Sequence, residues 1–269
     1  MCHACVMESV KDRMVSRRDL FRGAAAGAAV AAVGTAPPAL AAGHGSVRDL
    51  THTYDGSFPT YFGEPGLSSE KTFDFADSGF NLYVLTVNEH TGTHIDAPLH
   101  FSADGASVDE LPVEDLVVPL CVVDIREKAD ADPDAQVTPE DLDAWIAANG
   151  DIPDRACVAM LSGWAPKASG EGFRNVDAEG VMHFPGFHPD ATAMLLETTA
   201  VAMAVDTLSL DHGPSADFAT HYAWLPAGRY GIECIAGLEG LPAAGATLVV
   251  GAPKHRGGTG GPARIMALV

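Results

Sequence analysis

The chain has 269 residues, of which 47% are hydrophobic and 19% charged, so it is long enough to bury a sizeable core. Its 36 acidic residues against 16 basic ones give a formal charge of −20 and a pI near 4.7. Such a surface repels phosphate backbones and anionic lipid headgroups, so nucleic acid is excluded as an expected partner.

The N-terminal 41 residues differ in composition from the rest and are typical of an export signal. Residues 16–22, Ser-Arg-Arg-Asp-Leu-Phe-Arg, resemble the twin-arginine motif, and an Ala- and Gly-rich apolar run follows at residues 23–36. This run falls short of the roughly 20 strongly apolar residues of a membrane span, so we expect no stable membrane insertion. Cleavage near Ala41 would leave residues 42–269 as a periplasmic or secreted protein.

The rest of the chain alternates between strand and helix patterns. Alternating apolar and polar residues at 81–88 predict a strand that leads into the next motif. Short runs rich in Val, Ile and Leu predict further strands at residues 116–125, 156–161, 201–205, 246–250 and 263–269. A capping box at Thr138 and a stop at Gly150 predict one helix, and residues 189–198 a second. This order indicates an α/β or mixed α+β class in one domain, residues 42–269.

Residues 90–100 hold three histidines and an aspartate in the sequence His-Thr-Gly-Thr-His-Ile-Asp-Ala-Pro-Leu-His. Gly92 and its flanking threonines disfavour a helix and indicate a loop with a tight bend. We expect this bend to bring His90, His94 and Asp96 to one point. Imidazole nitrogens and a carboxylate oxygen suit Zn²⁺ or Mn²⁺ and leave positions open for water. The alternative is a polar loop whose histidines cap backbone groups.

The same segment resembles the His-x-Gly-Thr-His-x-Asp-x-Pro-x-His signature of the metal-dependent cyclase family, which includes bacterial kynurenine formamidases and isatin hydrolases. Segments at 206–211, 231–233 and 257–264 also look like family segments, so the resemblance covers residues 47–269. It implies an α/β fold in a single domain, a swivelling β/β/α arrangement, and a homodimer.

The resemblance also implies a centre of two ions, Zn²⁺ or Mn²⁺. Its implied ligands are His90, His94, Asp96, His221 and Glu233. The first two histidines would bind one ion and His221 the other, with the two carboxylates as bridges. His100 would be the catalytic acid or base, and its alternative role is support of a ligand.

Substrate residues are indicated less directly. Tyr61 stands where family members carry a Trp in a Pro-x-Trp segment, which implies contact with an aromatic substrate. Trp164, Phe187 and Trp224 either line an apolar pocket or belong to the core. Arg264 is a candidate partner for a substrate carboxylate. The glycines at 257–261 lack the spacing of a phosphate-binding loop, so we expect a flexible loop there.

The expected function is hydrolysis of a C–N amide bond in a small aromatic molecule by metal-activated water, as in an arylformamidase that converts N-formylkynurenine to kynurenine and formate. One alternative is the opening of a cyclic amide such as isatin. The other is a non-catalytic periplasmic protein that binds a metal or a small ligand.

Overall fold

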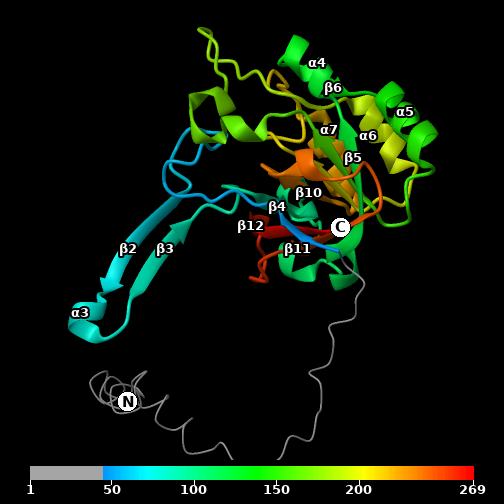
Figure 1. Ribbon diagram of the computed structural model, residues 1–269. Coiled ribbons are helices and arrows are strands. Elements are labelled where there is room, and N and C mark those ends of the chain that lie inside the picture. The colour runs from blue at the N-terminus through cyan, green and yellow to red at the C-terminus, as the bar shows by residue number, and fades with distance from the viewer. Residues whose placement is uncertain (1–44) are drawn as a thin grey trace, which may run out of the picture. The chain divides into compact units, whose positions relative to one another are not determined.

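The computed structural model describes residues 45–269, which divide into two units (Figure 1). The larger unit comprises residues 45–69 and Leu85–Val269, and the smaller one is Glu70–Val84. The expected signal peptide, residues 1–41, lies outside the described residues. Within residues 45–269, no helix is long and apolar enough to cross a membrane.

The smaller unit belongs to a two-stranded hairpin of β2 (Leu67–Phe73) and β3 (Leu82–Val87). A short helix, α3 (Phe75–Ser78), joins the strands; the Asp74 side chain accepts a hydrogen bond from the backbone N–H of Ala76 at its start. The strand predicted at residues 81–88 is therefore present, but it pairs with β2. Every side chain of β3 is exposed.

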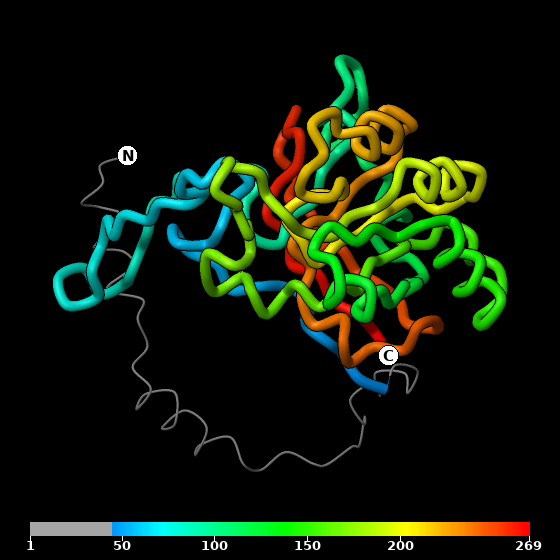
Figure 2. The backbone as a smooth tube through the Cα atoms, turned by 90° about the horizontal axis from the view of Figure 1, so that it is seen from above, coloured from blue at the N-terminus to red at the C-terminus, as the bar shows by residue number. Residues whose placement is uncertain are grey.

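The larger unit is built on one nine-stranded sheet (Figures 1 and 2). Its order is β1 (Val47–Asp49), β13 (Arg264–Leu268), β11 (Ala246–Gly251), β5 (Val117–Asp124), β7 (Cys157–Leu161), β9 (Ala202–Val205), β10 (Tyr230–Glu233), β4 (His94–Asp96) and β12 (Gly260–Pro262). Strands β5, β7, β9 and β10 are parallel, and the strands on both sides of this block are antiparallel. The five strands predicted after residue 100 are all present.

The longer helices are α4 (Arg126–Ala131), α5 (Pro139–Asn149), α6 (Pro189–Leu196) and α7 (Ala219–Trp224). Helix α5 begins as predicted, because Asp141 accepts a hydrogen bond from the Thr138 backbone N–H at 2.7 Å and completes the capping box. A short sheet pairs β6 (Gln136–Val137) with β8 (Gly186–Phe187). The 3₁₀ helices are η1 (Pro98–Phe101), η2 (Val108–Glu110), η3 (Val113–Leu116), η4 (Ala165–Ser169), η5 (Glu171–Phe173), η6 (Leu225–Ala227) and η7 (Leu238–Gly240).

The sheet separates two apolar cores. In β7, Val158 and Met160 pack with the helices, whereas Ala159 faces the opposite core. That second core joins Ile95 of β4 to Ile265 of β13, near opposite ends of the strand order, so the sheet curls around it. Burial of a large apolar side chain such as Met160 contributes about 1.5–3 kcal/mol. The predicted α/β class is confirmed.

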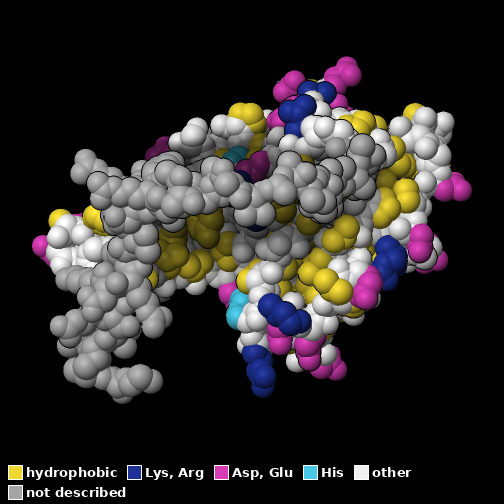
Figure 3. Space-filling view, turned by 60° about the horizontal axis from the view of Figure 1, so that its bottom comes forward, with side chains coloured by type: hydrophobic (Ala, Val, Ile, Leu, Met, Phe, Trp, Pro, Cys, Tyr) yellow, Lys and Arg dark blue, Asp and Glu magenta, His cyan; other side chains and the backbone are white. Residues whose placement is uncertain are grey.

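One face of the molecule carries charges of both signs. On the face drawn in Figure 3, Lys and Arg side chains lie beside Asp and Glu side chains and form no separate basic area.

Candidate metal centre

Strand β4 places two predicted ligands on one face. His94 and Asp96 are two residues apart and so point the same way, while Ile95 between them lies in the core. In the antiparallel pairing of β10 with β4, Glu233 lies opposite His94 and Gly231 opposite Asp96. The Glu233 carboxylate therefore meets the imidazole, with Oε2 at 3.3 Å from His94 Nε2.

Glycines on both neighbouring strands leave room around Asp96. Gly231 of β10 and Gly260 of β12 both lie opposite it. A Cβ added at Gly260 would lie 2.2 Å from the Ile95 carbonyl oxygen and 2.9 Å from His90 Cε1. The expectation of a flexible loop at 257–261 is thus wrong for Gly260 and Gly261, which belong to β12 and pair with β4. A Cβ at Gly261 would lie 2.4 Å from Pro253 Cγ, so neither position has space for a side chain.

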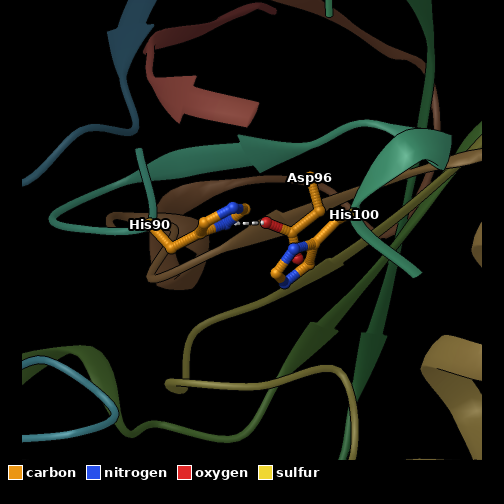
Figure 4. Close-up of side chains that lie close together, drawn as sticks. All are labelled: His90, Asp96 and His100. Carbon is orange, nitrogen blue, oxygen red and sulfur yellow. Dashed lines mark hydrogen bonds and ion pairs between the residues drawn. The ribbon is translucent and has the colours of Figure 1, made fainter. Parts of the chain in front are cut away.

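The bend at Gly92 brings His90 back to the strand. Gly92 has φ +64°, a conformation that favours glycine, and a Cβ there would lie 2.8 Å from the Tyr54 ring. The imidazole of His90 consequently reaches Asp96, with Nδ1 at 2.7 Å from Oδ1 (Figure 4). This convergence confirms the bend predicted from the sequence.

His221, the distant histidine of the predicted set, enters the same site from α7. Its Nδ1–H donates to Asp211 Oδ2 at 2.6 Å. The other ring nitrogen, Nε2, then faces Glu233 Oε1 at 3.2 Å and Asp96 Oδ2 at 3.6 Å. The structure therefore brings all five predicted ligands together. Asp211 was not singled out in the sequence, because the nine residues between it and His221 show no local pattern.

The arrangement fits a divalent cation. His94 Nδ1 donates to the Gly92 carbonyl oxygen at 2.9 Å, so Nε2 is directed at the carboxylates. His94 Nε2 and Asp96 Oδ2 are buried and make no hydrogen bond within the described part of the chain. Two donor groups, His90/Asp96/His100 and His94/Asp96/Glu233, each have their ligand atoms within 4.8 Å of one another. This nitrogen and oxygen set suits Zn²⁺ or Mn²⁺.

The electrostatics of the site favour positive charge. Burial alone would lower the pKa of His94, but the Asp96 and Glu233 carboxylates, each 3.3 Å from Nε2, hold it well above the usual range. The pKa of His221 is raised well above the usual range in the same way, against burial, by Asp211, Asp96 and Glu233. Carboxylates this close together require a cation between them, either protons or a metal ion.

His100 lies beside the ligands on η1. Its ring stacks on His90 with the centroids 3.8 Å apart and an angle of 21° (Figure 4). Burial lowers the pKa of His100, although the Asp96 carboxylate acts in the opposite direction. A neutral imidazole at this position can accept a proton near pH 7, which is what the predicted acid or base role requires. His100 also belongs to the donor group His90/Asp96/His100, so the geometry fits a role as a metal ligand as well.

A cavity of about 640 Å³ opens onto these groups. Its lining comprises Thr60, Tyr61, Phe62, Glu64, Pro65, Asn88, His90, His100, Phe101, Leu208, Ser209, Phe218, His221, Tyr222 and Glu233. Tyr61 thus occupies the expected wall. The ring centroids of Phe218 and Tyr61 are 5.8 Å apart, and those of Phe218 and Phe101 are 5.6 Å apart. The sequence did not identify these phenylalanines, whose positions follow from the start of α7 and from η1.

Other aromatic and basic candidates lie elsewhere. Trp164, Phe187 and Trp224 are buried in the core rather than in the cavity wall. Arg264 is exposed and pairs with Asp49, with Nη2 at 2.6 Å from Oδ2, so it does not reach the cavity. In the described part of the chain, no Lys or Arg lines the cavity.

Comparison with known proteins agrees with this geometry. The family model Cyclase, described as "Putative cyclase", matches residues 48–212. An isatin hydrolase of Roseibium aggregatum is 35% identical over 69% of this chain and 73% of its own. A kynurenine formamidase of Salinibacter ruber is 29% identical over 70% of this chain and 80% of its own. The crystal structure of an isatin hydrolase bound to the product analogue thioisatinate superposes with a TM-score of 0.80 and 29% identity, over 95% of this chain and 99% of that one. The chain belongs to the cyclase family.

Proposed function

We propose that this protein is a metal-dependent hydrolase that opens the C–N bond of an uncharged aromatic amide, with a cyclic amide such as isatin as the first candidate. The observation that carries the proposal is a cavity with aromatic walls whose lining includes the predicted metal ligands His90, His221 and Glu233. Similarity to an isatin hydrolase of 35% identity supports the same substrate class.

The charge of the cavity supports this choice of substrate. N-formylkynurenine carries an amino-acid carboxylate, which needs a cationic or multiple N–H partner when it leaves water. The described lining offers the acids Glu64 and Glu233 and no Lys or Arg, while nearby Arg174 binds the Tyr61 carbonyl oxygen at 3.1 Å. Arylformamidase activity therefore remains the second candidate, supported by the related kynurenine formamidase.

The chemistry assigns a role to each group. His90, His94, Asp96, His221 and Glu233 would hold Zn²⁺ or Mn²⁺, which supplies Lewis acidity and lowers the pKa of a water bound to it. The rings of Tyr61, Phe101 and Phe218 would hold the substrate ring and exclude bulk water. His100 would accept a proton from the attacking water as its oxygen bonds to the acyl carbon, and would deliver that proton to the amide nitrogen as the C–N bond breaks. In a cyclic amide this nitrogen stays attached to the aromatic ring.

The test compares two substrates in parallel. Isatin and N-formylkynurenine are each supplied to metal-reconstituted protein and to a chelator-treated control, and product release is followed by absorbance. The proposal predicts chelator-sensitive turnover with a higher kcat/KM for isatin. A higher kcat/KM for N-formylkynurenine would reverse the order of the two candidates. Metal binding without turnover of either would support a binding protein and contradict hydrolysis of both.

We also propose that the protein is exported by the twin-arginine route and acts as a homodimer. The motif at residues 16–22 supports export. Exposed apolar side chains on β3, among them Tyr83 and Leu85, suit a protein interface. Cell fractionation of the full chain tests the first part, and light scattering after size-exclusion chromatography tests the second. Protein that stays in the cytoplasm, or a monomer at micromolar concentration, would contradict them.

A further inference from the structure

The outer nitrogen of His90 begins a short chain of hydrogen bonds. His90 Nε2 lies 2.9 Å from Thr259 Oγ1. The same hydroxyl lies 2.5 Å from Glu89 Oε2, and the backbone N–H of Thr259 donates to that oxygen at 3.2 Å. Two side chains from distant parts of the sequence, Glu89 and Thr259, thus meet behind the imidazole.

The direction of these bonds follows from proton counting. An ionised carboxylate only accepts, so the single hydroxyl proton of Thr259 is donated to Glu89. Toward His90 the hydroxyl can then only accept, and the proton between them belongs to His90 Nε2. A ring that carries one proton therefore has its lone pair on Nδ1, which is the atom that faces Asp96 Oδ1 at 2.7 Å.

Further contacts hold Glu89 and the glycine-rich segment in place. His255 Nε2 lies 2.6 Å from Glu89 Oε1. The N–H of Gly257 donates to Asp109 Oδ1 at 2.9 Å, which fixes the turn that leads to Thr259.

We propose that Glu89 and Thr259 are positioning residues that fix His90 as a metal ligand through Nδ1. The inference rests on the proposed function, because it concerns the same centre. The Thr259 hydroxyl restricts the rotation of the His90 ring, which is partly open to solvent. It also fixes the ring proton on Nε2. Hydrogen-bond partners of this kind typically change metal affinity or activity by about 10–100-fold when they are removed.

The test is a Zn²⁺ titration of chelator-stripped protein against a competing indicator. Thr259→Val keeps the shape and removes the hydroxyl, so Zn²⁺ affinity is expected to fall about 10–100-fold. Thr259→Ser keeps the hydroxyl and should restore most of the affinity. Thr198→Val is the matched control, because it removes a hydroxyl that donates to the Leu195 carbonyl oxygen at the end of α6. The control should bind Zn²⁺ as tightly as the wild type.

A second measurement needs no variant. Long-range ¹H–¹⁵N correlation spectra of the zinc-loaded wild-type protein are expected to show the His90 proton on Nε2. A proton on Nδ1, or unchanged Zn²⁺ affinity in Thr259→Val, would overturn the inference. Failure of the proposed function would look different: the variants would show the expected order of Zn²⁺ affinity while neither isatin nor N-formylkynurenine was hydrolysed.

Discussion

Replacement of Asp211 by Asn tests how the His221 ligand is oriented. Asp211 is 3% exposed, and its carboxylate faces donors only. Oδ1 accepts from the Thr220 N–H at 2.8 Å, and Oδ2 accepts from the backbone N–H and Nδ1 of His221 at 3.2 and 2.6 Å. An Asn side chain has one acceptor oxygen and one NH₂ group, so either amide orientation places an NH₂ against a donor.

The expected size of the effect depends on that orientation. With the amide nitrogen toward Thr220, one buried N–H loses its partner, which lowers the free energy of unfolding by about 1–3 kcal/mol. With the amide nitrogen toward His221, the imidazole must accept at Nδ1 and carry its proton on Nε2, the atom that faces Glu233. That proton competes with the metal, so Zn²⁺ affinity should fall about 10–100-fold.

Two assays separate these effects. Urea unfolding of the zinc-free protein measures the stability term, and a Zn²⁺ competition titration measures the ligand term. Asp217→Asn is the control on the same loop, since Asp217 accepts only an exposed hydrogen bond from Ser215 Oγ at 3.2 Å. If Asp211→Asn binds Zn²⁺ as tightly as Asp217→Asn, the orientation argument is refuted.

Three further predictions follow from other parts of the structure. His100→Ala should lose turnover and keep bound Zn²⁺, measured by steady-state kinetics and metal analysis; full activity would exclude the proton-transfer role. Gly260→Ala should lower the free energy of unfolding in urea by about 1–3 kcal/mol or more, because its Cβ would lie 2.2 Å from a backbone oxygen. The control Gly240→Ala has nothing within 4 Å and should be close to neutral; equal effects would contradict the packing argument. Hydrogen bonds to Asp134 and Asp177 raise the pKa of His183 above 6.5. The stabilisation of the fold by protonated His183 is thus complete below pH 6.5 and is lost as the pH rises through the raised pKa. The wild type should therefore exceed His183→Gln in Tm by less as the pH is raised through this range. A difference in Tm that does not change with pH would contradict the prediction.

The sequence predicted those parts of the fold that have a local cause. The strands at β5, β7 and β9 are continuous apolar runs because both faces are buried, and α5 has a complete capping box. The short strands β4 and β12 were not predicted from the sequence. Three residues are too few to show an alternation of apolar and polar side chains, and glycine is disfavoured in strands.

The same distinction holds for the site. His90, His94 and Asp96 were found because their spacing is local, and His221 and Glu233 only through the family resemblance. Asp211 contacts His221 from the segment before α7, and Thr259 contacts His90 from the segment before β12; no short sequence pattern encodes either contact. The wall residue Phe218 depends on a left-handed backbone conformation, φ 51°, at the start of α7, which is uncommon for phenylalanine and was not foreseen.

The most direct test of the proposal that this protein is a metal-dependent hydrolase measures the rate of isatin hydrolysis. One preparation is assayed in three states: as purified, after chelation, and after addition of Zn²⁺ or Mn²⁺. His94→Ala is measured alongside, because it removes a buried imidazole whose Nε2 lies 3.3 Å from both the Asp96 and the Glu233 carboxylate. The account predicts turnover that is lost on chelation, restored by the metal and absent in His94→Ala. Undiminished turnover in the chelated protein or in His94→Ala would contradict it.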